Sequence, residues 1–591
     1  MTTPETGSPL TWTDDGQPRS RLFGDVYFSA EDGLAETRAV FLEGCGLPGA
    51  WAERRRFVVG ELGFGTGLNI VALLDLWRRT RPAEGRLHVF TIEGHPITAE
   101  EAARALSRWP EVAGIAEALV RRWPGRARGV HRIELPEFAA VVDVAVMDVA
   151  EALAGWTGRA DAWFLDGFSP ALNPQMWTDE ILALVGARSA PGARAATFTV
   201  AGQVRRGLAA AGFAVEKRPG FGRKRERLEA HMPGEAADSP VRRVAVVGAG
   251  IAGAAAARAV RALGGEAVVL DAEGPGAGGS GNPAGLVTPR LDAGLGPPAR
   301  LFAQAFARAA RLYEDHAEAI LARGVLQLAA AERDEGRFAR IAASDLFEPD
   351  ALEMLSAEAA TVRLGEPAPA ALDQRTALVL EPAPVLAAWT GEVRRARIAS
   401  LYSRDGEWVL LDEAGEQVLR ADAVILAAAQ GSAALLPDLP LRPVRGQASW
   451  TTEAAFGVAA AWGGYVLPIR GGVLFGATHD RDDAATDVRA GDHIRNLETL
   501  ARALPGLAGR VGAARLEGRA AVRATTPDRL PIAGGAQPGL FVLTGFGSRG
   551  LSMAPLLAEH VAAEVMGAPS PLPAASQALV AADRFARRGH S

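Results

Sequence analysis

Glycines and acids that could hold a nucleotide-like ligand occur first in the segment FVVGELGFGTGLN, residues 57–69. An apolar strand leads there into Glu61, and the turn that follows it contains Gly63, Gly65 and Gly67. Glycines at alternate positions let the backbone approach a ligand closely, because side chains there would block it. The motif alone also suits a tight turn that binds nothing, so the strands that follow decide between the two interpretations.

Acidic residues follow three further strands in this half of the chain. Glu93 ends the run LHVFTIE, Asp148 ends VDVAVMD, and Asp166 stands in DAWFLDGFSP. The carboxyl ends of parallel strands meet at one edge of an open α/β sheet, and an acid after the second strand typically binds ribose hydroxyls. The pattern therefore predicts one ligand site at this edge, although Asp166 alone would also suit a helix cap.

These features, in this order, resemble the class I methyltransferase fold. The resemblance implies S-adenosylmethionine as ligand, with Glu61 and the three glycines beside its methionine part, Glu93 on its ribose and Asp148 on its adenine. Asp166 and Phe168 occupy the position after the fourth strand where amine methyltransferases hold the acceptor, which must be neutral and oriented to attack a methyl sulfonium. The segment DGFSP departs from the Asn/Asp-Pro-Pro-aromatic form of that motif, so both assignments rest on position.

A second glycine motif opens the other half of the chain. In VRRVAVVGAGIAG, residues 241–253, Gly248, Gly250 and Gly253 follow an apolar strand and precede a helical pattern. The next strand ends in Asp271. This context predicts a dinucleotide site, with pyrophosphate at the helix N-terminus and Asp271 on a ribose, and leaves NAD or FAD open.

Two later glycine-rich segments favour FAD. The segments are GAGGSGNPAG, residues 276–285, which includes Ser280, Gly281 and Asn282, and GFGSRG, residues 545–550, which includes Gly545, Gly547 and Gly550. With RPVRGQ (442–447), GGYVLPIRGGVLFGATHD (463–480) and AVRATTPDRLPIAGG (521–535), they make residues 241–565 resemble the D-amino-acid oxidase and glycine oxidase family. The resemblance implies that a carbon beside an amine nitrogen gives up a hydride.

A substrate of that kind carries a carboxylate, which calls for a bidentate guanidinium. Arg523 is the first choice, because the family presents an arginine on the strand before the last flavin loop. Arg549 is the second choice, and Tyr465 is a candidate hydroxyl partner. Each of these three residues would also suit a purely structural role.

Both halves alternate β-branched runs with longer helical patterns, which predicts parallel α/β sheets. A short polar segment, MPGEAADSP at residues 232–240, suits a linker between them. We therefore expect a Rossmann-like class I methyltransferase domain at residues 1–238. A Rossmann-type FAD domain with an inserted antiparallel substrate subdomain is expected at residues 241–591.

The full length resembles the family of bifunctional enzymes that make 5-methylaminomethyl-2-thiouridine in tRNA. The segments DVYFSAEDGLAETRAVFL (25–42), DAWFLDGFSPALNPQMW (161–177) and GFGRKRE (220–226), followed by the flavin half, carry the resemblance. It implies that the flavin domain removes the carboxymethyl group from 5-carboxymethylaminomethyl-(2-thio)uridine at the wobble position of tRNA. The methyltransferase domain would then convert the resulting 5-aminomethyl group to 5-methylaminomethyl.

Two other interpretations are compatible with parts of this pattern. One is a small-molecule amino-acid oxidase fused to an unrelated amine methyltransferase. The other is a tRNA-binding scaffold without catalysis, against which the intact Glu93, Asp166 and Asp271 speak.

Composition and charge limit the class of protein. With 591 residues, 48% hydrophobic and 22% charged, the chain is typical of soluble globular proteins. Cys45 is the only cysteine, which excludes an intramolecular disulfide and a cysteine-built zinc site. No apolar run is long enough for a membrane span, and residues 1–16 do not read as a secretory signal. We expect a cytoplasmic monomer without a metal or membrane partner.

A tRNA substrate needs a basic surface, whereas the formal net charge is −6. Residues 188–227 contain ten lysines or arginines against two acids, and Arg121, Arg122, Arg126, Arg128 and Arg132 form an acid-free cluster. Both clusters suit phosphate contacts, although such runs are equally typical of a solvated face.

A first prediction concerns the attachment of the flavin. Because no cysteine follows Cys45, a cysteinyl thioether to the flavin cannot form in the second half of the chain. We expect acid or heat precipitation of the purified protein to release FAD into the supernatant, as measured by absorbance. Yellow colour retained in the pellet would contradict this expectation.

Overall fold

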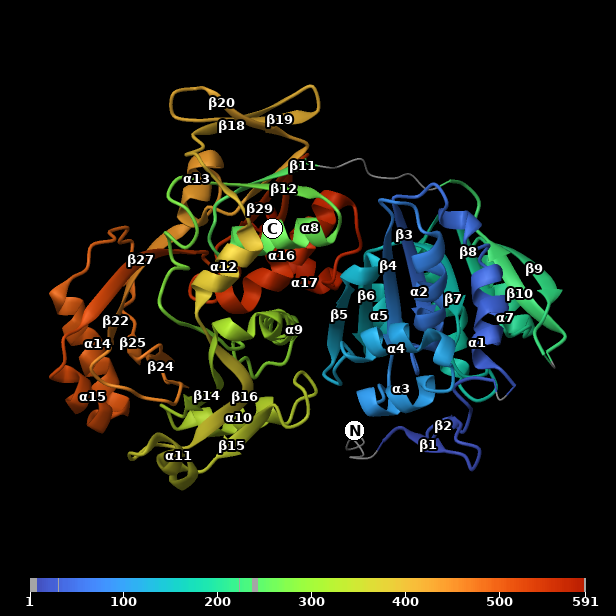
Figure 1. Ribbon diagram of the computed structural model, residues 1–591, viewed down its shortest axis with the longest axis horizontal. Helices are drawn as coiled ribbons and strands as arrows, with labels where there is room; N and C mark the ends of the chain where they lie inside the picture. The colour runs from blue at the N-terminus through green and yellow to red at the C-terminus, as the bar shows by residue number, and fades with distance from the viewer. Residues whose placement is uncertain (1–7, 30, 223, 236–242, 589–591) are drawn as a thin grey trace. The chain divides into compact units, whose positions relative to one another are not determined.

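The computed structural model of the chain describes residues 8–29, 31–222, 224–235 and 243–588. Its contacts divide the chain into two compact units, drawn in Figure 1: Met1–Pro240 with Ala568–Ala574, and Val241–Gly567 with Ala575–Ser591. Residues 236–240 of the expected linker lie outside the described residues. The segment Ala568–Ala574, which the sequence placed with the flavin half, groups with the first unit.

The first unit is built on one eight-stranded sheet. Its strands, in spatial order, are β5 (Gly129–Leu135), β6 (Ala140–Val146), β4 (Arg86–Glu93), β3 (Arg56–Leu62), β7 (Ala160–Leu165), β8 (Ser189–Thr197), β10 (Glu226–His231) and β9 (Ala214–Pro219). The five from β6 to β8 run parallel, while β5, β10 and β9 pair antiparallel at the edges. The sequence predicted the parallel centre, and the edge strand β5 was not expected.

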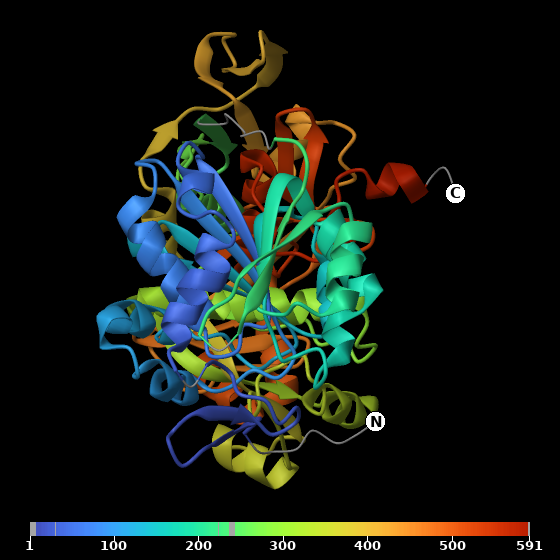
Figure 2. The same cartoon turned by 90° about the vertical axis from the view of Figure 1, so that its right-hand side faces the viewer.

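Helices cover both faces of this sheet, as the blue and green helices of Figure 2 show. One layer contains α1 (Gly33–Thr37), α2 (Leu68–Thr80), α3 (Ala99–Leu106) and α4 (Ala113–Val120), and the other contains α5 (Val149–Gly155), α6 (Asp179–Ala187) and α7 (Gly202–Ala210). Adjacent residues of β3 belong to different cores, with Val58 on one face and Val59 on the other. This two-sided burial explains the unbroken apolar run in the sequence.

The second unit begins with a six-stranded sheet, which is parallel except for the last strand. Its strands, in order, are β17 (Val393–Arg395), β12 (Glu266–Asp271), β11 (Arg243–Val247), β21 (Ala423–Leu426), β29 (Leu540–Thr544) and β28 (Ile532–Gln537). Helix α8 (Ile251–Ala262), which follows β11, packs against α16 (Gly550–Met566), which follows β29. A Rossmann-type arrangement was predicted here and is confirmed.

A separate ten-stranded sheet forms the inserted subdomain of this unit. The strands used below are β14 (Ile320–Leu328), β22 (Arg442–Thr451), β23 (Ala460–Ala461), β24 (Tyr465–Ile469), β25 (Gly472–Gly476) and β27 (Glu517–Thr525). All pairings in the sheet are antiparallel except that of β14 with β23. Helices α14 (Ala490–Ala503) and α15 (Pro505–Gly512) pack at the end of the sheet that contains β22 and β25 (Figure 1).

A buried charge cluster ties β4, β5 and β6 together in the first unit. Arg132 on β5 donates two hydrogen bonds to Asp143 on β6, at 2.8 and 2.7 Å, and the His88 ring of β4 lies 2.8 Å from the same carboxylate. Burial opposes ionisation of Asp143, but the charge and hydrogen bonds of Arg132 lower its pKa well below the usual range. Burial also lowers the pKa of His88, so its neutral ring donates to Asp143.

This cluster corrects part of the expected basic surface. Arg132 is buried, and Arg121, Arg122 and Arg128 each pair with a glutamate. The run at residues 121–132 is therefore largely neutralised within the fold.

We predict that Asp143→Asn destabilises the protein, because it leaves the Arg132 guanidinium buried without its counter-charge, at a cost of about 3–5 kcal/mol. Since the folded-state pKa of Asp143 is lowered, its contribution is present above the ordinary carboxyl pKa and is lost as the pH falls. The free energy of unfolding in urea, followed by tryptophan fluorescence, measures the loss. The exposed Asp179→Asn serves as control, and equal unfolding midpoints for the two variants would refute the prediction.

Candidate functional sites

A cavity of 690 Å³ lies at the carboxyl edge of the parallel strands in the first unit. Of the residues expected there, Gly63 and Gly65 after β3, Glu93 at the end of β4, Asp148 after β6, and Asp166 and Phe168 after β7 line it. The four strand ends therefore converge as the sequence predicted. Glu61 and Gly67 are not among the lining residues.

The glycine turn is held by the acid of the neighbouring strand. The Glu93 carboxylate accepts from the backbone N–H of Gly65 at 2.9 Å and from that of His95 at 2.8 Å. Gly63, Gly65 and Gly67 have φ angles of 88°, 51° and 77°, which side chains strain to adopt. Gly67 is the N-cap of α2, so its role is in the turn and not on the cavity wall.

Asp166 is a half-buried carboxylate in the wall of this cavity. Its Oδ2 accepts from Asn69 Nδ2 at 2.7 Å, and Asn69 Oδ1 accepts from the Thr37 hydroxyl at 2.8 Å. Burial raises the pKa of Asp166 to about 6, against the opposing hydrogen bond from Asn69. The group is ionised at neutral pH yet basic enough to accept a proton.

Glu61 is a different kind of acid. It is fully buried on β3, and Thr91 Oγ1 donates to its Oε2 at 2.6 Å, while Oε1 has no hydrogen-bond partner among the described residues. Burial raises the pKa of Glu61 to about 8, so the group is largely protonated at neutral pH. Its place among the contacts of the methionine part, expected from the motif, stays a prediction.

Aromatic rings gather at the same cavity. The Phe168 ring lies 5.0 Å from that of Phe23 and 5.3 Å from that of Tyr27, measured between centroids. Burial, with the nearby Glu93, raises the pKa of Tyr27, which therefore keeps its proton. Phe23, Tyr27 and Asn69 were not singled out from the sequence, although Tyr27 lies in the quoted segment DVYFS.

A larger cavity, of 1710 Å³, lies in the second unit. The expected residues that line it are Gly248, Gly250, Asp271, Ser280, Asn282, Tyr465, Arg523, Gly545, Gly547, Arg549 and Gly550. Gly253 and Gly281 do not line it. A β-carbon at Gly253 would lie 1.8 Å from the Gly248 carbonyl oxygen, so this glycine permits the close packing of turn and helix.

The first turn of this cavity has the form that a dinucleotide requires. Gly248 has a φ angle of 113°, and α8 begins three residues later with its N-terminus at the cavity. Asp271, the last residue of β12, accepts from the backbone N–H groups of Ala249 at 2.8 Å and Gly274 at 2.7 Å. Ser280 Oγ accepts from the backbone N–H of Ile251 at 3.0 Å. These residues fit the phosphates and a ribose of FAD.

Arg523 lies across a glycine of the paired strand. It stands on β27 opposite Val444 of β22, and a β-carbon at Gly446 would lie 2.1 Å from its Nη1. Nη1 donates to the Thr478 carbonyl at 3.2 Å, and the residue lines the cavity together with Tyr465 and His479. Gly446 lies within the motif RPVRGQ, but the sequence did not indicate that the Arg523 guanidinium packs against it.

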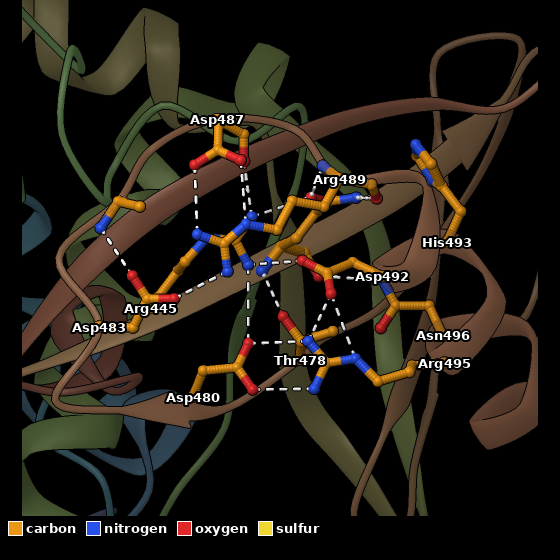
Figure 3. Close-up of polar contacts among 12 residues, drawn as sticks. Arg445, Thr478, Asp480, Asp483, Asp487, Arg489, Asp492, His493, Arg495 and Asn496 are labelled. Carbon is orange, nitrogen blue, oxygen red and sulfur yellow. Dashed lines mark hydrogen bonds and ion pairs between the residues drawn. The ribbon is translucent and has the colours of Figure 1, made fainter.

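Arg445 of β22 belongs to an ion network with charged residues of the segment 480–495, shown in Figure 3. Arg445 is fully buried and donates to Asp492 at 2.5 Å and to the Asp487 carbonyl at 2.6 Å. Arg495 joins Asp480 to Asp492, and Arg489 joins Asp483 to Asp487. The network therefore fixes the segment 480–492, which begins two residues after Thr478.

Arg549 is less free to bind a ligand. It is deeply placed in the cavity wall, and its Nη1 donates to Thr288 Oγ1 at 2.8 Å. Burial lowers its pKa, although an arginine stays charged. Arg523 thus remains the stronger candidate for a carboxylate.

Sequence comparisons agree with this division. Residues 110–233 match the family described as S-adenosyl-L-methionine-dependent methyltransferase, and residues 243–564 match FAD dependent oxidoreductase. The tRNA 5-methylaminomethyl-2-thiouridine biosynthesis bifunctional protein MnmC of Caulobacter sp. (strain K31) is 62% identical over 99% of this chain and 98% of its own. That of Maricaulis maris (strain MCS10) is 45% identical over 98% and 96%. The chain belongs to the MnmC family.

Among solved structures, glycine oxidase from Geobacillus kaustophilus superposes with a TM-score of 0.51. It is 23% identical and covers 58% of this chain and 99% of its own, a likeness in fold. Family membership confirms the two predicted activities and their cofactors, S-adenosylmethionine and FAD. Within the described ranges, no group of three or more His, Cys, Asp or Glu residues could hold a metal ion, and no helix is long and apolar enough to cross a membrane.

We predict that Gly446→Ala impairs the oxidase cavity, because the new methyl group and the Arg523 guanidinium cannot occupy the same space. Titration of the flavin absorbance with glycolate, a small carboxylate, should show binding weakened by about tenfold or more, as for loss of a charged hydrogen bond. Gly457→Ala is the matched control, since a β-carbon there meets nothing within 4 Å. Equal glycolate affinity in both variants would show that Arg523 does not bind carboxylates.

Proposed function

We propose that the chain modifies the wobble uridine of tRNA in two steps, using its two cavities in turn. The flavin unit removes the carboxymethyl group from 5-carboxymethylaminomethyl-(2-thio)uridine, and the methyltransferase unit methylates the exposed amine. The observation that carries the proposal is the opposite charge of the two cavities, combined with a family likeness over 99% of the chain.

The flavin cavity is cationic, as suits a carboxylate substrate. Seven arginines line it against four acids: Arg290, Arg333, Arg337, Arg397, Arg523, Arg529 and Arg549 against Asp271, Glu273, Asp334 and Glu413. Arg523 binds the carboxylate of the carboxymethyl group, with Tyr465 beside it. FAD, when bound, accepts the hydride of the CH₂ between this carboxylate and the nitrogen. Loss of that hydride and of the N–H proton leaves an imine, and water splits it into the primary amine and glyoxylate.

The methyltransferase cavity is acidic, as suits a cationic donor and an ammonium acceptor. Five acids line it against a single lysine: Asp25, Glu36, Glu93, Asp148 and Asp166 against Lys224. The Asp166 carboxylate takes a proton from the aminomethyl ammonium, and Phe168 packs against the acceptor. S-adenosylmethionine, when bound, supplies the methyl group to the amine lone pair, with cleavage of its C–S bond. A methylated ammonium is formed and the sulfonium becomes a neutral thioether.

Phosphate contacts are assigned to exposed arginines of the methyltransferase unit. Arg205 and Arg206 on α7 and Arg225 before β10 are exposed, and none of them pairs with an acid in the described part of the chain. These three suit the tRNA backbone. We also propose that a monomer acts, in the cytoplasm where tRNA is modified.

We predict that Asp166→Asn and Arg523→Ala block different steps. Asp166→Asn removes the proton acceptor, so tRNA should stop at the 5-aminomethyl stage. Arg523→Ala removes the charged partner of the substrate carboxylate, a loss of roughly 2–5 kcal/mol for a buried pair, so the carboxymethylaminomethyl form should accumulate. Nucleoside mass spectrometry of tRNA from a deletion strain complemented with each variant measures both.

Asp179→Asn and Arg442→Ala, exposed residues of the same two units, serve as controls and should restore the fully modified nucleoside. The assignment of roles fails if both active-site variants accumulate one intermediate. It fails equally if Arg523→Ala yields the methylated product at normal levels.

A further inference from the structure

Lys224 of the GFGRKRE segment lies against the methyltransferase cavity and not among the surface phosphate contacts. Its Nζ donates to Glu36 Oε1 at 2.8 Å and lies 4.2 Å from the centre of the Phe198 ring. All three residues line the cavity that contains Asp166. An ammonium group in this structure is therefore held by one carboxylate and one aromatic face, the combination that recognises alkylammonium ions.

Glu36 and Phe198 come from elements fixed by the core. Glu36 lies in the first turn of α1, with its side chain only 14% exposed, and Phe198 directly follows β8 and packs against Trp177 at 6.3 Å between ring centroids. Lys224, in contrast, lies in the connection between β9 and β10, with its side chain 47% exposed. The Glu36 carboxylate and the Phe198 ring are therefore held in place by the fold, whereas the ammonium between them belongs to a long side chain on a loop.

The acceptor amine of the proposed reaction has the same functional group as Lys224. We propose that Glu36 and Phe198 form the binding site for the protonated aminomethyl group of the substrate, and that Lys224 occupies this site until the substrate displaces it. The inference rests on the proposed function, since it names how that acceptor is held. Asp166, Glu36 and Lys224 line the same cavity, and both Glu36 and Lys224 act electrostatically on Asp166, so the proposed ammonium site shares its cavity with the proton acceptor.

Displacement of Lys224 costs little, because an ion pair half open to solvent is weak. Its loss also removes the single lysine from the cavity wall when the cationic substrate arrives. Lys224 thus acts as a stand-in cation that pairs with Glu36 until the substrate arrives. A neutral 5-substituent carries no positive charge for Glu36 and Phe198 to attract, so these two residues select the amine.

The test uses the full chain loaded with S-adenosylhomocysteine and two nucleosides that lack phosphate. 5-Aminomethyluridine carries the ammonium, and 5-hydroxymethyluridine is the matched neutral ligand. Calorimetry should show that Glu36→Gln weakens binding of the amine by about tenfold, while Lys224→Met strengthens it by about threefold. Neither change should alter the affinity for the hydroxymethyl nucleoside.

Lys217→Met is the control lysine, because Lys217 also forms an ion pair, with Glu226 at 2.7 Å, but does not line the cavity. It should change nothing. Weakening of amine binding by both Glu36→Gln and Lys224→Met would overturn the proposal, since the pair would then only hold the loop in place. The absence of amine binding or of amine preference in the wild-type protein would overturn it too.

Methylation of aminomethyl-tRNA by the same wild-type preparation tests the proposed function independently. Suppose that the wild type methylates this tRNA and that Glu36→Gln binds 5-aminomethyluridine as tightly as the wild type does. The proposed ammonium site is then wrong, but the proposed function stands. If the wild type does not methylate it, the proposed function itself is wrong.

Discussion

One hydrogen-bond arrangement supports both cavities. In each unit the acid that ends the second parallel strand accepts a backbone N–H from the glycine turn after the first strand: Glu93 from Gly65 at 2.9 Å, and Asp271 from Ala249 at 2.8 Å. The bond fixes a turn whose glycines adopt angles that other residues strain to reach. Helix N-terminus, turn and acid then face the same space, and every later functional residue is placed around it.

The two cavities differ in charge although they share this frame. The flavin cavity is lined by arginines from loops, from the helix Arg333–Ala342 and from the inserted sheet. The methyltransferase cavity is lined by acids, three of which, Glu93, Asp148 and Asp166, lie at or just after the ends of parallel strands. The proposed intermediate explains the contrast, because oxidation consumes a carboxylate-bearing group and leaves an ammonium. A carboxylate is attracted to the first cavity and a cation to the second. The charges of the two cavities are thus consistent with oxidation first and methylation second.

The frame was predictable from sequence because glycine spacing and acids at strand ends are local signals. The methyltransferase strand ends, the Rossmann turn and the flavin cofactor all followed from them. Asn69, Glu36 and Gly446 were not predictable, because their roles depend on neighbours that are distant in the chain. Arg132 was misread for the same reason: its partner Asp143 lies on the neighbouring strand, so a run that looks basic in sequence is neutral in the fold.

Successive residues of strand β22 face opposite sides of the sheet and serve different purposes. Arg445 and Gln447 enter the buried ion network, while Gly446 between them gives its surface to Arg523. An insertion or deletion of one residue within the strand would exchange the two faces, turning Arg445 toward the flavin cavity and leaving Asp492 without its buried arginine. Homologues can therefore vary in length in the loops on either side of β22, whereas a change of one residue within the strand would disrupt both faces at once.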